Sequence, residues 1–308
     1  MMDEHIPVLA VEVLQGLAPV ADGLYIDATF GRGGHTARIL ETLGGEGRVL
    51  ALDRDPAAIA AGRVRFAAEV RLALVHAPFA DLRQVVHDHA GDRPVAGVLF
   101  DLGVSSPQLD EAARGFSFSK DGPLDMRMDP TRGEPVAAWL ARAAVDEMRE
   151  VIAGLGEERH ARRIAESIAA ERDRAPIERT AQLAAIVARA VRTRDGKHPA
   201  TRTFQALRMH VNDELGQLAR GLAAAVDVLA PRGRLAVIAF HSLEDRLAKD
   251  FMRRESSLDP LLARLPMPPP HAAPRLRLVG RKHKASAAEV AANPRARSAV
   301  LRVAERVA

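Results

Sequence analysis

The sequence contains no cysteine. This absence excludes disulfide bonds, cysteine-ligated metal sites and any mechanism that depends on a thiol nucleophile. Long apolar runs are missing too, since none approaches the roughly 20 residues that a membrane span needs. The N-terminal residues MMDEH lack the basic start and apolar core of a signal peptide. We therefore expect a cytoplasmic protein that does not enter a membrane.

The composition is otherwise that of a globular protein, with 47% hydrophobic and 27% charged residues among 308. This length suffices for one large domain or two smaller ones with a hydrophobic core. The formal net charge is only +4, but residues 271–308 hold nine Lys or Arg against two Glu, a local charge of +7. A second basic cluster lies within residues 192–208. Two such clusters favour a nucleic-acid partner.

Residues 24–43 read as a strand, a glycine turn and a helix, the first unit of a nucleotide-binding α/β sheet. A dinucleotide fingerprint, Gly-x-Gly-x-x-Gly, would place its third glycine at position 36, which is Thr. Glycines at 31, 33 and 34 behind Asp27 instead suit S-adenosylmethionine, which has no pyrophosphate. An ordinary glycine-rich turn is the alternative.

A second apolar run, residues 47–53, ends at Asp53. Asp53 follows Gly33 by 20 residues, the spacing at which an acid after the second strand meets ribose hydroxyls. Asp55 directly precedes Pro56 and is the better cap for the next helix. We therefore expect the Asp53 carboxylate to be free to bind a ribose.

The strand pattern continues over residues 70–75, 95–101, 233–240 and 299–303, with helices between the early strands. Such alternation predicts a mostly parallel sheet, whose ligands bind at the carboxyl ends of the strands. Four side chains should therefore converge on one cleft: Asp27, Asp53, Phe79 and Asp101.

A long stretch interrupts the α/β pattern. It contains a polar loop at 115–130 and predicted helices at 135–153, 157–173 and 180–194. We predict a helical insertion at 114–215, inside a domain made of 1–113 and 216–308. A helix over 216–230 leads back to the sheet, and the proline-rich segment 258–274 should form a surface loop.

The fourth strand runs into a segment with one proline, residues 101–110. Methyltransferases that act on amino groups of bases carry an Asp/Asn/Ser-Pro-Pro-aromatic segment at this place. Acceptors on the amine N–H groups direct its lone pair toward the sulfonium methyl, so no metal or covalent nucleophile is needed. Here Gln108 replaces the aromatic residue, and a stacking ring must come from Phe116, Phe118 or Phe240. The lack of cysteine also argues against methylation at a ring carbon.

Several motifs together resemble the RsmH family, also called MraW, of bacterial small-subunit ribosomal RNA (cytosine-N4)-methyltransferases. They are DATFGRGGH at 27–35, DLGVSSPQLD at 101–110, GFSF at 115–118, GPLDMRMDP at 122–130, KHPATRTFQA at 197–206, FHSLEDR at 240–246 and NPRARS at 293–298. The resemblance covers nearly the whole chain. It implies a class I, Rossmann-like methyltransferase fold, S-adenosylmethionine as methyl donor, and a decoding-region cytosine in the assembled small subunit as acceptor. The insertion would then recognise RNA.

The resemblance also assigns site residues. Those expected around the cofactor are Gly33, Gly34 and His35 at the methionine end, Asp53 at the ribose, Phe79 at the adenine, and Asp101 and Gln108 closing the pocket. Asp101 and Ser105 are the catalytic candidates, with Asp125 and His241 as runners-up. Candidate phosphate contacts are Arg127, Lys197, Arg202, Arg208 and Arg295.

Two other functions stay open on the sequence alone. One is a nicotinamide-dependent oxidoreductase on the same fold, against which the missing third glycine argues. The other is a non-catalytic RNA-binding assembly protein. The sequence also leaves the oligomeric state open, with a homodimer as one alternative.

Overall fold

A computed structural model describes residues 7–191, 198–258 and 273–307. The chain divides into two compact units, residues 1–103 with 215–308 (unit 1) and residues 104–214 (unit 2). The first division therefore falls earlier than position 113, where the sequence pattern placed it. The helix α5 (Ser106–Asp110) and the 3₁₀ turn η2 (Ala112–Arg114) belong to unit 2.

Unit 1 is built on one eight-stranded sheet in the order β3-β2-β1-β4-β5-β8-β6, with β7 also paired to β8. Neighbours from β3 to β5 are parallel, whereas β8 is antiparallel to β5, β6 and β7. This is the Rossmann-like α/β fold that the sequence predicted. The strands are β1 (Leu24–Asp27), β2 (Arg48–Asp53), β3 (Leu72–His76), β4 (Val95–Asp101), β5 (Leu229–Ala239), β6 (Leu276–Leu278), β7 (His283–Lys284) and β8 (Val300–Arg306).

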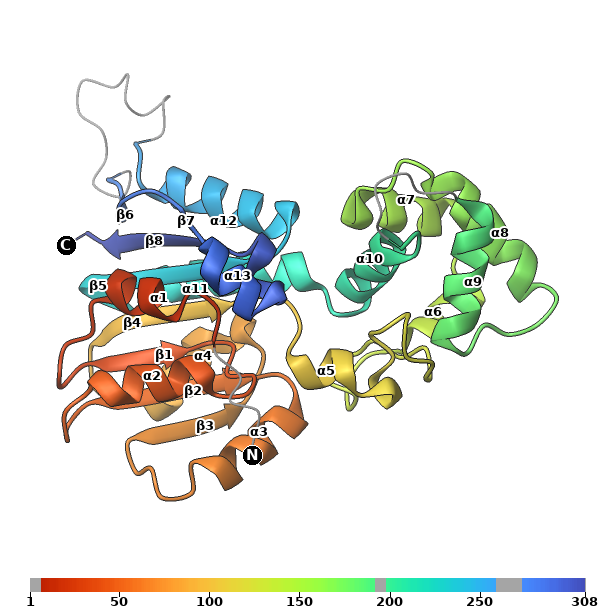
Figure 1. The fold of residues 1–308 in the computed structure, drawn as a ribbon. Helices are drawn as coiled ribbons and strands as arrows, with labels where there is room; N and C mark the ends of the chain where they lie inside the picture. Colours follow the sequence, from red (N-terminus) through yellow and green to blue (C-terminus); the bar gives the residue numbers. More distant parts are fainter. Residues whose placement is uncertain (1–6, 192–197, 259–272, 308) are drawn as a thin grey trace. The chain divides into compact units, whose positions relative to one another are not determined.

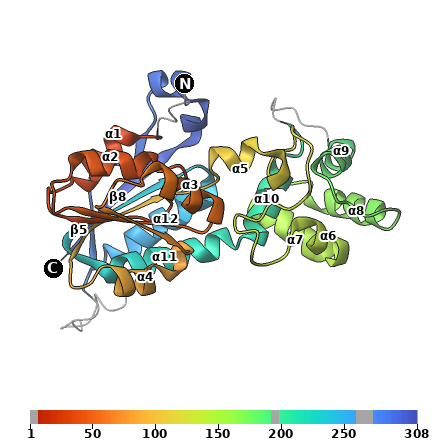
Figure 2. The ribbon, with the colours of Figure 1, turned by 90° about the horizontal axis from the view of Figure 1, so that it is seen from below.

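Helices cover both faces of this sheet (Figures 1 and 2). Successive strand residues alternate between two cores: Ile26 packs with α4, α11 and α12, and Tyr25 packs with α1 and α2. Burial on both faces explains why the central strands read as continuous apolar runs. The helices of unit 1 are α1 (Ala10–Leu17), α2 (Gly34–Thr42), α3 (Pro56–Arg65), α4 (Leu82–His89), α11 (Glu214–Val228), α12 (Ser242–Glu255) and α13 (Ala287–Ala292), with 3₁₀ turns η1 (Phe79–Asp81) and η5 (Pro294–Ser298).

The strand predictions differ from the structure mainly at strand ends. The fourth strand has the predicted bounds, while the expected strand at 233–240 begins earlier, at Leu229. Its start was hidden because the pairing register shifts between Val95–Leu229 and Gly97–Arg234. Arg232 has a positive φ of 68° in this irregular stretch. A bulge that contains Pro and Gly thus resembles a loop in the sequence.

Unit 2 has a separate helical core centred on Trp139, Ile152, Ile164 and Leu183. Its longer helices are α6 (Val136–Arg142), α7 (Val145–Gly156), α8 (Ala161–Arg172), α9 (Thr180–Ala190) and α10 (Thr201–Val211). The helices expected at 157–173 and 180–194 correspond to α8 and α9, although residues 192–194 lie outside the described part.

The prediction of one helix over 135–153 was wrong, because α6 ends and α7 begins around two extended residues, Ala143 and Ala144. No glycine or proline marks this break. The Arg172 side chain of α8 donates to the carbonyls of Leu140 and Ala143, satisfying the end of α6. A contact made from a later helix therefore fixes this boundary.

The loop 115–130 contains no helix and only one isolated bridge, Pro123 to Arg179. Asn212 holds it, accepting from the Met128 N–H at 2.8 Å and donating to the Met126 carbonyl at 2.7 Å. Most of the predicted proline-rich loop, 259–272, lies outside the described residues. Within the described part of the chain, no helix is both long and apolar enough to cross a membrane.

Candidate cofactor and active site

The turn between β1 and α2 needs glycine at two positions because of its backbone conformation and close packing. Gly33 caps α2 with a φ of 71°, and a Cβ there would lie 2.7 Å from the rings of Phe30 and Phe66. Gly31 also has a positive φ, 53°, and its N–H donates to Asp53 Oδ2 at 2.7 Å. The turn thus joins the ends of β1 and β2.

Asp27, at the end of β1, is only 1% exposed. It accepts from Thr36 Oγ1 at 2.7 Å and from the Thr29 N–H at 3.2 Å. Burial raises the pKa of this carboxyl above its usual value, although both hydrogen bonds oppose the change. Asp27 therefore lies near His35 and Asp101, but its buried, hydrogen-bonded carboxyl supports the turn from beneath.

His35 and Asp101 meet above this support. His35 Nε2 lies 3.5 Å from Asp101 Oδ2, and their side chains are 6% and 27% exposed. Burial disfavours the imidazolium, but the carboxylates of Asp101 and Asp27 outweigh it and raise the pKa of His35. The Asp101 N–H donates to Thr29 Oγ1 at 2.6 Å, which fixes the end of β4.

Two buried polar atoms in this pair lack a hydrogen-bond partner among the described residues: His35 Nε2 and Asp101 Oδ1. A buried acceptor or donor without a partner costs about 1–3 kcal/mol. Such atoms at the carboxyl ends of parallel strands are typical of a site completed by a polar ligand.

The sequence analysis expected a free Asp53 carboxylate, but in the structure this carboxylate already has hydrogen-bond partners. Its two oxygens accept from the backbone N–H groups of Gly31 at 2.7 Å and Asp55 at 2.8 Å. Burial nevertheless raises the pKa of Asp53 to about 6. Because each carboxylate oxygen has two lone pairs, further acceptor positions remain for ribose hydroxyls. Asp55 caps α3 as predicted, accepting from the Ala57 N–H.

Phe79 stands on η1, which follows β3. Its ring packs edge-on against Phe100, with centroids 5.5 Å apart. A Cβ at Gly221 would lie 2.8 Å from this ring, so α11 also holds it in place. The ring is only partly buried, which leaves surface for an adenine to contact.

Ser105 and Gln108 belong to unit 2. Ser105 is the N-cap of α5, and its N–H donates to Gln108 Oε1 at 3.0 Å. This pairing is half of a capping box, so both residues have a structural role in starting α5. Their predicted roles in catalysis and cofactor binding remain predictions.

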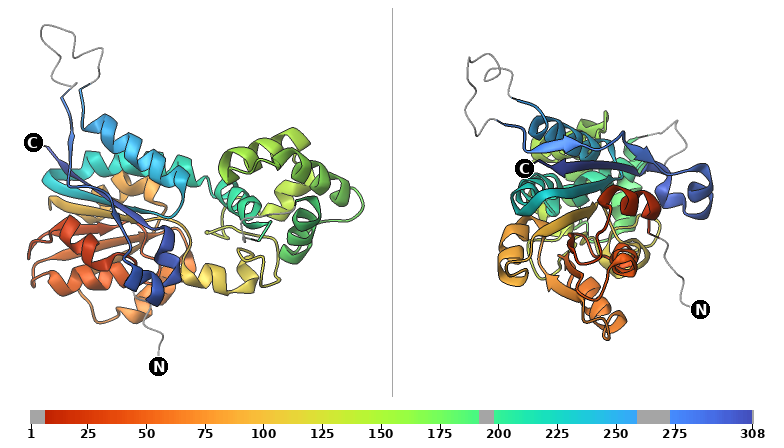
Figure 3. Two further views of the ribbon diagram at one scale, coloured as in Figure 1. Left: turned by 45° about the horizontal axis from the view of Figure 1, so that its top comes forward. Right: turned by 90° about the vertical axis from the view of Figure 1, so that its left-hand side faces the viewer.

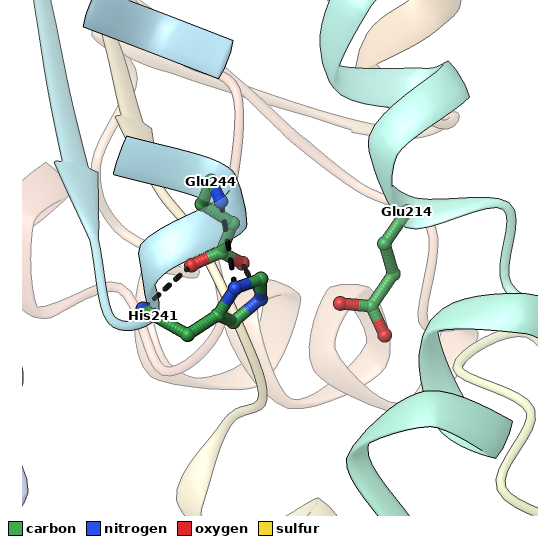
Figure 4. A group of neighbouring side chains, drawn as sticks. All are labelled: Glu214, His241 and Glu244. Atoms are coloured by element: carbon green, nitrogen blue, oxygen red, sulfur yellow. Dashed lines mark hydrogen bonds and ion pairs between the residues drawn. The ribbon is translucent and has the colours of Figure 1, made fainter. Parts of the chain in front are cut away.

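His241, a runner-up for catalysis, starts α12 (Figure 4). Its Nδ1 accepts from the Glu244 N–H, and its Nε2 lies 3.1 Å from Glu244 Oε1. Glu244 Oε2 in turn accepts from the N–H groups of Phe240 and His241. This reciprocal cap accounts for His241 without a catalytic role.

Asp125 and Arg127, predicted as a catalytic runner-up and a phosphate contact, bind each other. Both Nε and Nη2 of Arg127 donate to the Asp125 carboxylate, at 2.7 and 2.8 Å. Burial alone would raise the pKa of Asp125, but the Arg127 hydrogen bonds lower it below its usual value. An ionised, paired carboxylate inside the loop 115–130 is well placed to hold that loop.

The other predicted phosphate contacts differ in their surroundings. Arg208 makes two hydrogen bonds of 2.7 Å to Glu214, and both side chains are nearly buried. Arg202 is 45% exposed and lies 3.8 Å from the buried carboxylate of Glu158. Arg295 is exposed on η5. Lys197 lies outside the described residues.

Comparison with known proteins gives the family. A model of the MraW methylase family matches residues 2–307. The chain belongs to that family. The ribosomal RNA small subunit methyltransferase H of Dechloromonas aromatica is 55% identical over 308 residues, covering 98% of each chain. The proteins of the same name from Azoarcus sp. and Thiobacillus denitrificans are each 56% identical, covering 98% and 100% of this chain and 97% and 99% of theirs.

Family membership confirms the predicted methyltransferase class, with S-adenosylmethionine as methyl donor. It also removes the oxidoreductase alternative. The structure brings Gly33, Gly34, His35, Asp53 and Asp101 to the same edge of one sheet. Sequence reasoning missed Thr29 and Thr36, the hydrogen-bond partners of Asp101 and Asp27. Their position beside the glycine turn was the available signal.

Proposed function

We propose that the protein transfers the methyl group of S-adenosylmethionine to the exocyclic N4 amine of a decoding-region cytosine in small-subunit ribosomal RNA. Relatives named for small-subunit ribosomal RNA methylation, identical to this chain at more than half of the aligned positions, support the RNA class. The observation that carries the chemistry is the buried, partnerless Asp101 Oδ1 at the end of β4, beside the glycine turn.

Each predicted cofactor residue suits a different chemical group of S-adenosylmethionine. The Asp53 carboxylate would accept from the ribose hydroxyls, and the exposed side of the Phe79 ring would pack on the adenine. Asp101 would offer a carboxylate acceptor to the ammonium group of the methionine end, and His35 would offer an imidazole N–H donor to its carboxylate. When bound, the sulfonium supplies an electrophilic methyl group.

Asp101 would also act on the acceptor. If one carboxylate oxygen accepts from an N–H of the cytosine amine, the nitrogen lone pair is directed away from the ring and toward the methyl group. Ser105 is the second candidate acceptor. No thiol adduct is available to a chain without cysteine, which favours the amine over a ring carbon.

The test is methyl transfer by the purified protein. Small subunits from cells that lack this enzyme would be incubated with S-adenosylmethionine carrying a labelled methyl group, and the RNA digested to nucleosides for mass spectrometry. We expect labelled N4-methylcytidine. Label in another nucleoside would overturn the proposed acceptor, and tight RNA binding without any label would support the non-catalytic assembly protein.

A further inference from the structure

Most of the described cationic side chains after residue 273 fall into two groups. In the first, each arginine has a carboxylate partner: Arg275 with Asp227 and Glu255, Arg277 with Glu305, and Arg302 with Asp245.

The second group is Arg281, Lys282, His283, Lys284 and Arg297, all of them exposed. None of these five makes an ion pair within the described residues. We call these five residues the edge patch. Because these five cations lie close together in the chain and the described residues place no carboxylate within ion-pair distance of them, the edge patch is a local excess of uncompensated charge.

The sheet register places the edge patch relative to the site. Asp101 pairs with Ile238 on β5, Ile238 pairs with Leu301 on β8, and Leu301 pairs with His283 on β7. Three strand spacings separate Asp101 from His283, which is about 14–15 Å. Lys284 pairs with Val300 at the carboxyl end of β5, and Arg297 lies three residues before Val300 in the chain. Figure 3 shows the dark blue β8 beside the teal β5.

By contrast, the arginines of unit 2 that were predicted to contact phosphates have carboxylates beside them that neutralise their charge. Arg127 and Arg208 each bind a carboxylate through two nitrogen atoms, and Arg202 lies near Glu158. A phosphate would have to compete with those carboxylates. At the edge patch it would meet hydrated cations alone, and counterion release would favour its binding.

We propose that the edge patch is a binding surface for RNA backbone phosphates that flank the target nucleotide. This proposal rests on the proposed function, because it assumes that the substrate is RNA. It assigns a role in RNA binding to unit 1 itself, along an edge that starts within a few nucleotides' reach of Asp101.

A competing explanation is protection of the sheet edge. Edge strands often carry lysine to prevent pairing with another chain. If protection were the only role, removing the charges would promote self-association and leave RNA affinity unchanged.

The experiment compares two double variants with equal charge loss. Arg281→Gln with Arg297→Gln removes two edge-patch charges. Arg63→Gln with Arg253→Gln removes two exposed arginines near the ends of α3 and α12, helices that run back from the carboxyl ends of β2 and β5. Small-subunit affinity would be measured over a range of KCl concentrations, S-adenosylmethionine affinity by calorimetry, and self-association by sedimentation.

We expect the edge-patch variant to bind small subunits on the order of 10-fold more weakly at 0.15 M salt. Its log–log salt slope should fall by about one unit per lost phosphate contact. S-adenosylmethionine affinity should not change, and the control variant should match the wild type. An edge-patch variant with wild-type affinity and slope, or an equal loss in the control, would overturn the proposal. Wild-type protein that neither binds nor methylates small subunits would instead overturn the proposed function and the surface with it.

Discussion

Asp53 has a structural role, and we propose that the same carboxylate binds the ribose. It joins the turns after β1 and β2 through two backbone N–H groups, and its remaining lone pairs would accept from the ribose hydroxyls. A hydrogen bond to a charged group contributes about 1.5–3 kcal/mol. We therefore expect Asp53→Asn to weaken S-adenosylmethionine binding roughly 10- to 150-fold, measured by calorimetry. Unchanged affinity in the folded variant would exclude the ribose contact.

The raised pKa of Asp53 predicts how stability depends on pH. Its folded value is about 6 against an ordinary 3.8, so between these values the folded protein holds more protons than the unfolded chain. The free energy of unfolding of the cofactor-free protein should therefore fall as pH rises from about 4 to about 6, by on the order of 2–3 kcal/mol. Asp53→Asn should flatten this part of the profile in urea unfolding. An identical profile in wild type and variant would contradict the assignment.

Asp101 should matter to methyl transfer more than to folding. Its Oδ1 has no partner in the described protein, so Asp101→Asn removes no hydrogen bond there. Loss of one transition-state contact of this kind costs about 100- to 1000-fold in rate. The same change should lower the pKa of His35, because the Asp101 carboxylate helps to raise it. Activity assays and NMR titration of His35 would check both effects, and a variant with near-normal activity would remove Asp101 from the active site.

At the scale of elements, the pair Arg208–Glu214 links the end of α10 to the start of α11. Arg208→Ala would leave a nearly buried Glu214 carboxylate without its two hydrogen bonds. We expect a loss of about 2–3 kcal/mol in the free energy of unfolding, seen by urea denaturation. Adding Glu214→Gln should recover part of it. If Arg208→Ala weakens RNA binding while stability is unchanged, Arg208 is a phosphate contact as the sequence suggested.

Elements defined by local patterns were the ones that the sequence predicted. The bounds of the fourth strand could be predicted because an apolar run ends at Asp101. The helix α8 could be predicted because Ala161, Ile164, Ala165 and Ile168 form one buried face. The break after α6 could not be predicted from local sequence, because Arg172 on another helix stabilises it. The pairs Asp125–Arg127 and Arg208–Glu214 were hidden for a different reason: charged residues at these spacings pair only if the backbone brings them together.

At the scale of the whole molecule, the sequence was enough to predict the sheet, the glycine turn and the family. It did not show which charged side chains pair with each other. The contact between Thr29 and Asp101 joins residues 72 positions apart and depends on the parallel pairing of β1 with β4. The distribution of compensated and uncompensated arginines likewise depends on the fold. This distribution moves the expected RNA contacts toward the C-terminal edge of unit 1.

The central claim is that this chain methylates the N4 amine of a cytosine in small-subunit ribosomal RNA. The most direct measurement maps N4-methylcytidine in that RNA from cells with the protein, cells without it, and cells that carry only Asp101→Asn. The account predicts one decoding-region cytosine that is methylated in the first and unmodified in the other two. Identical methylation at every cytosine in all three would contradict it.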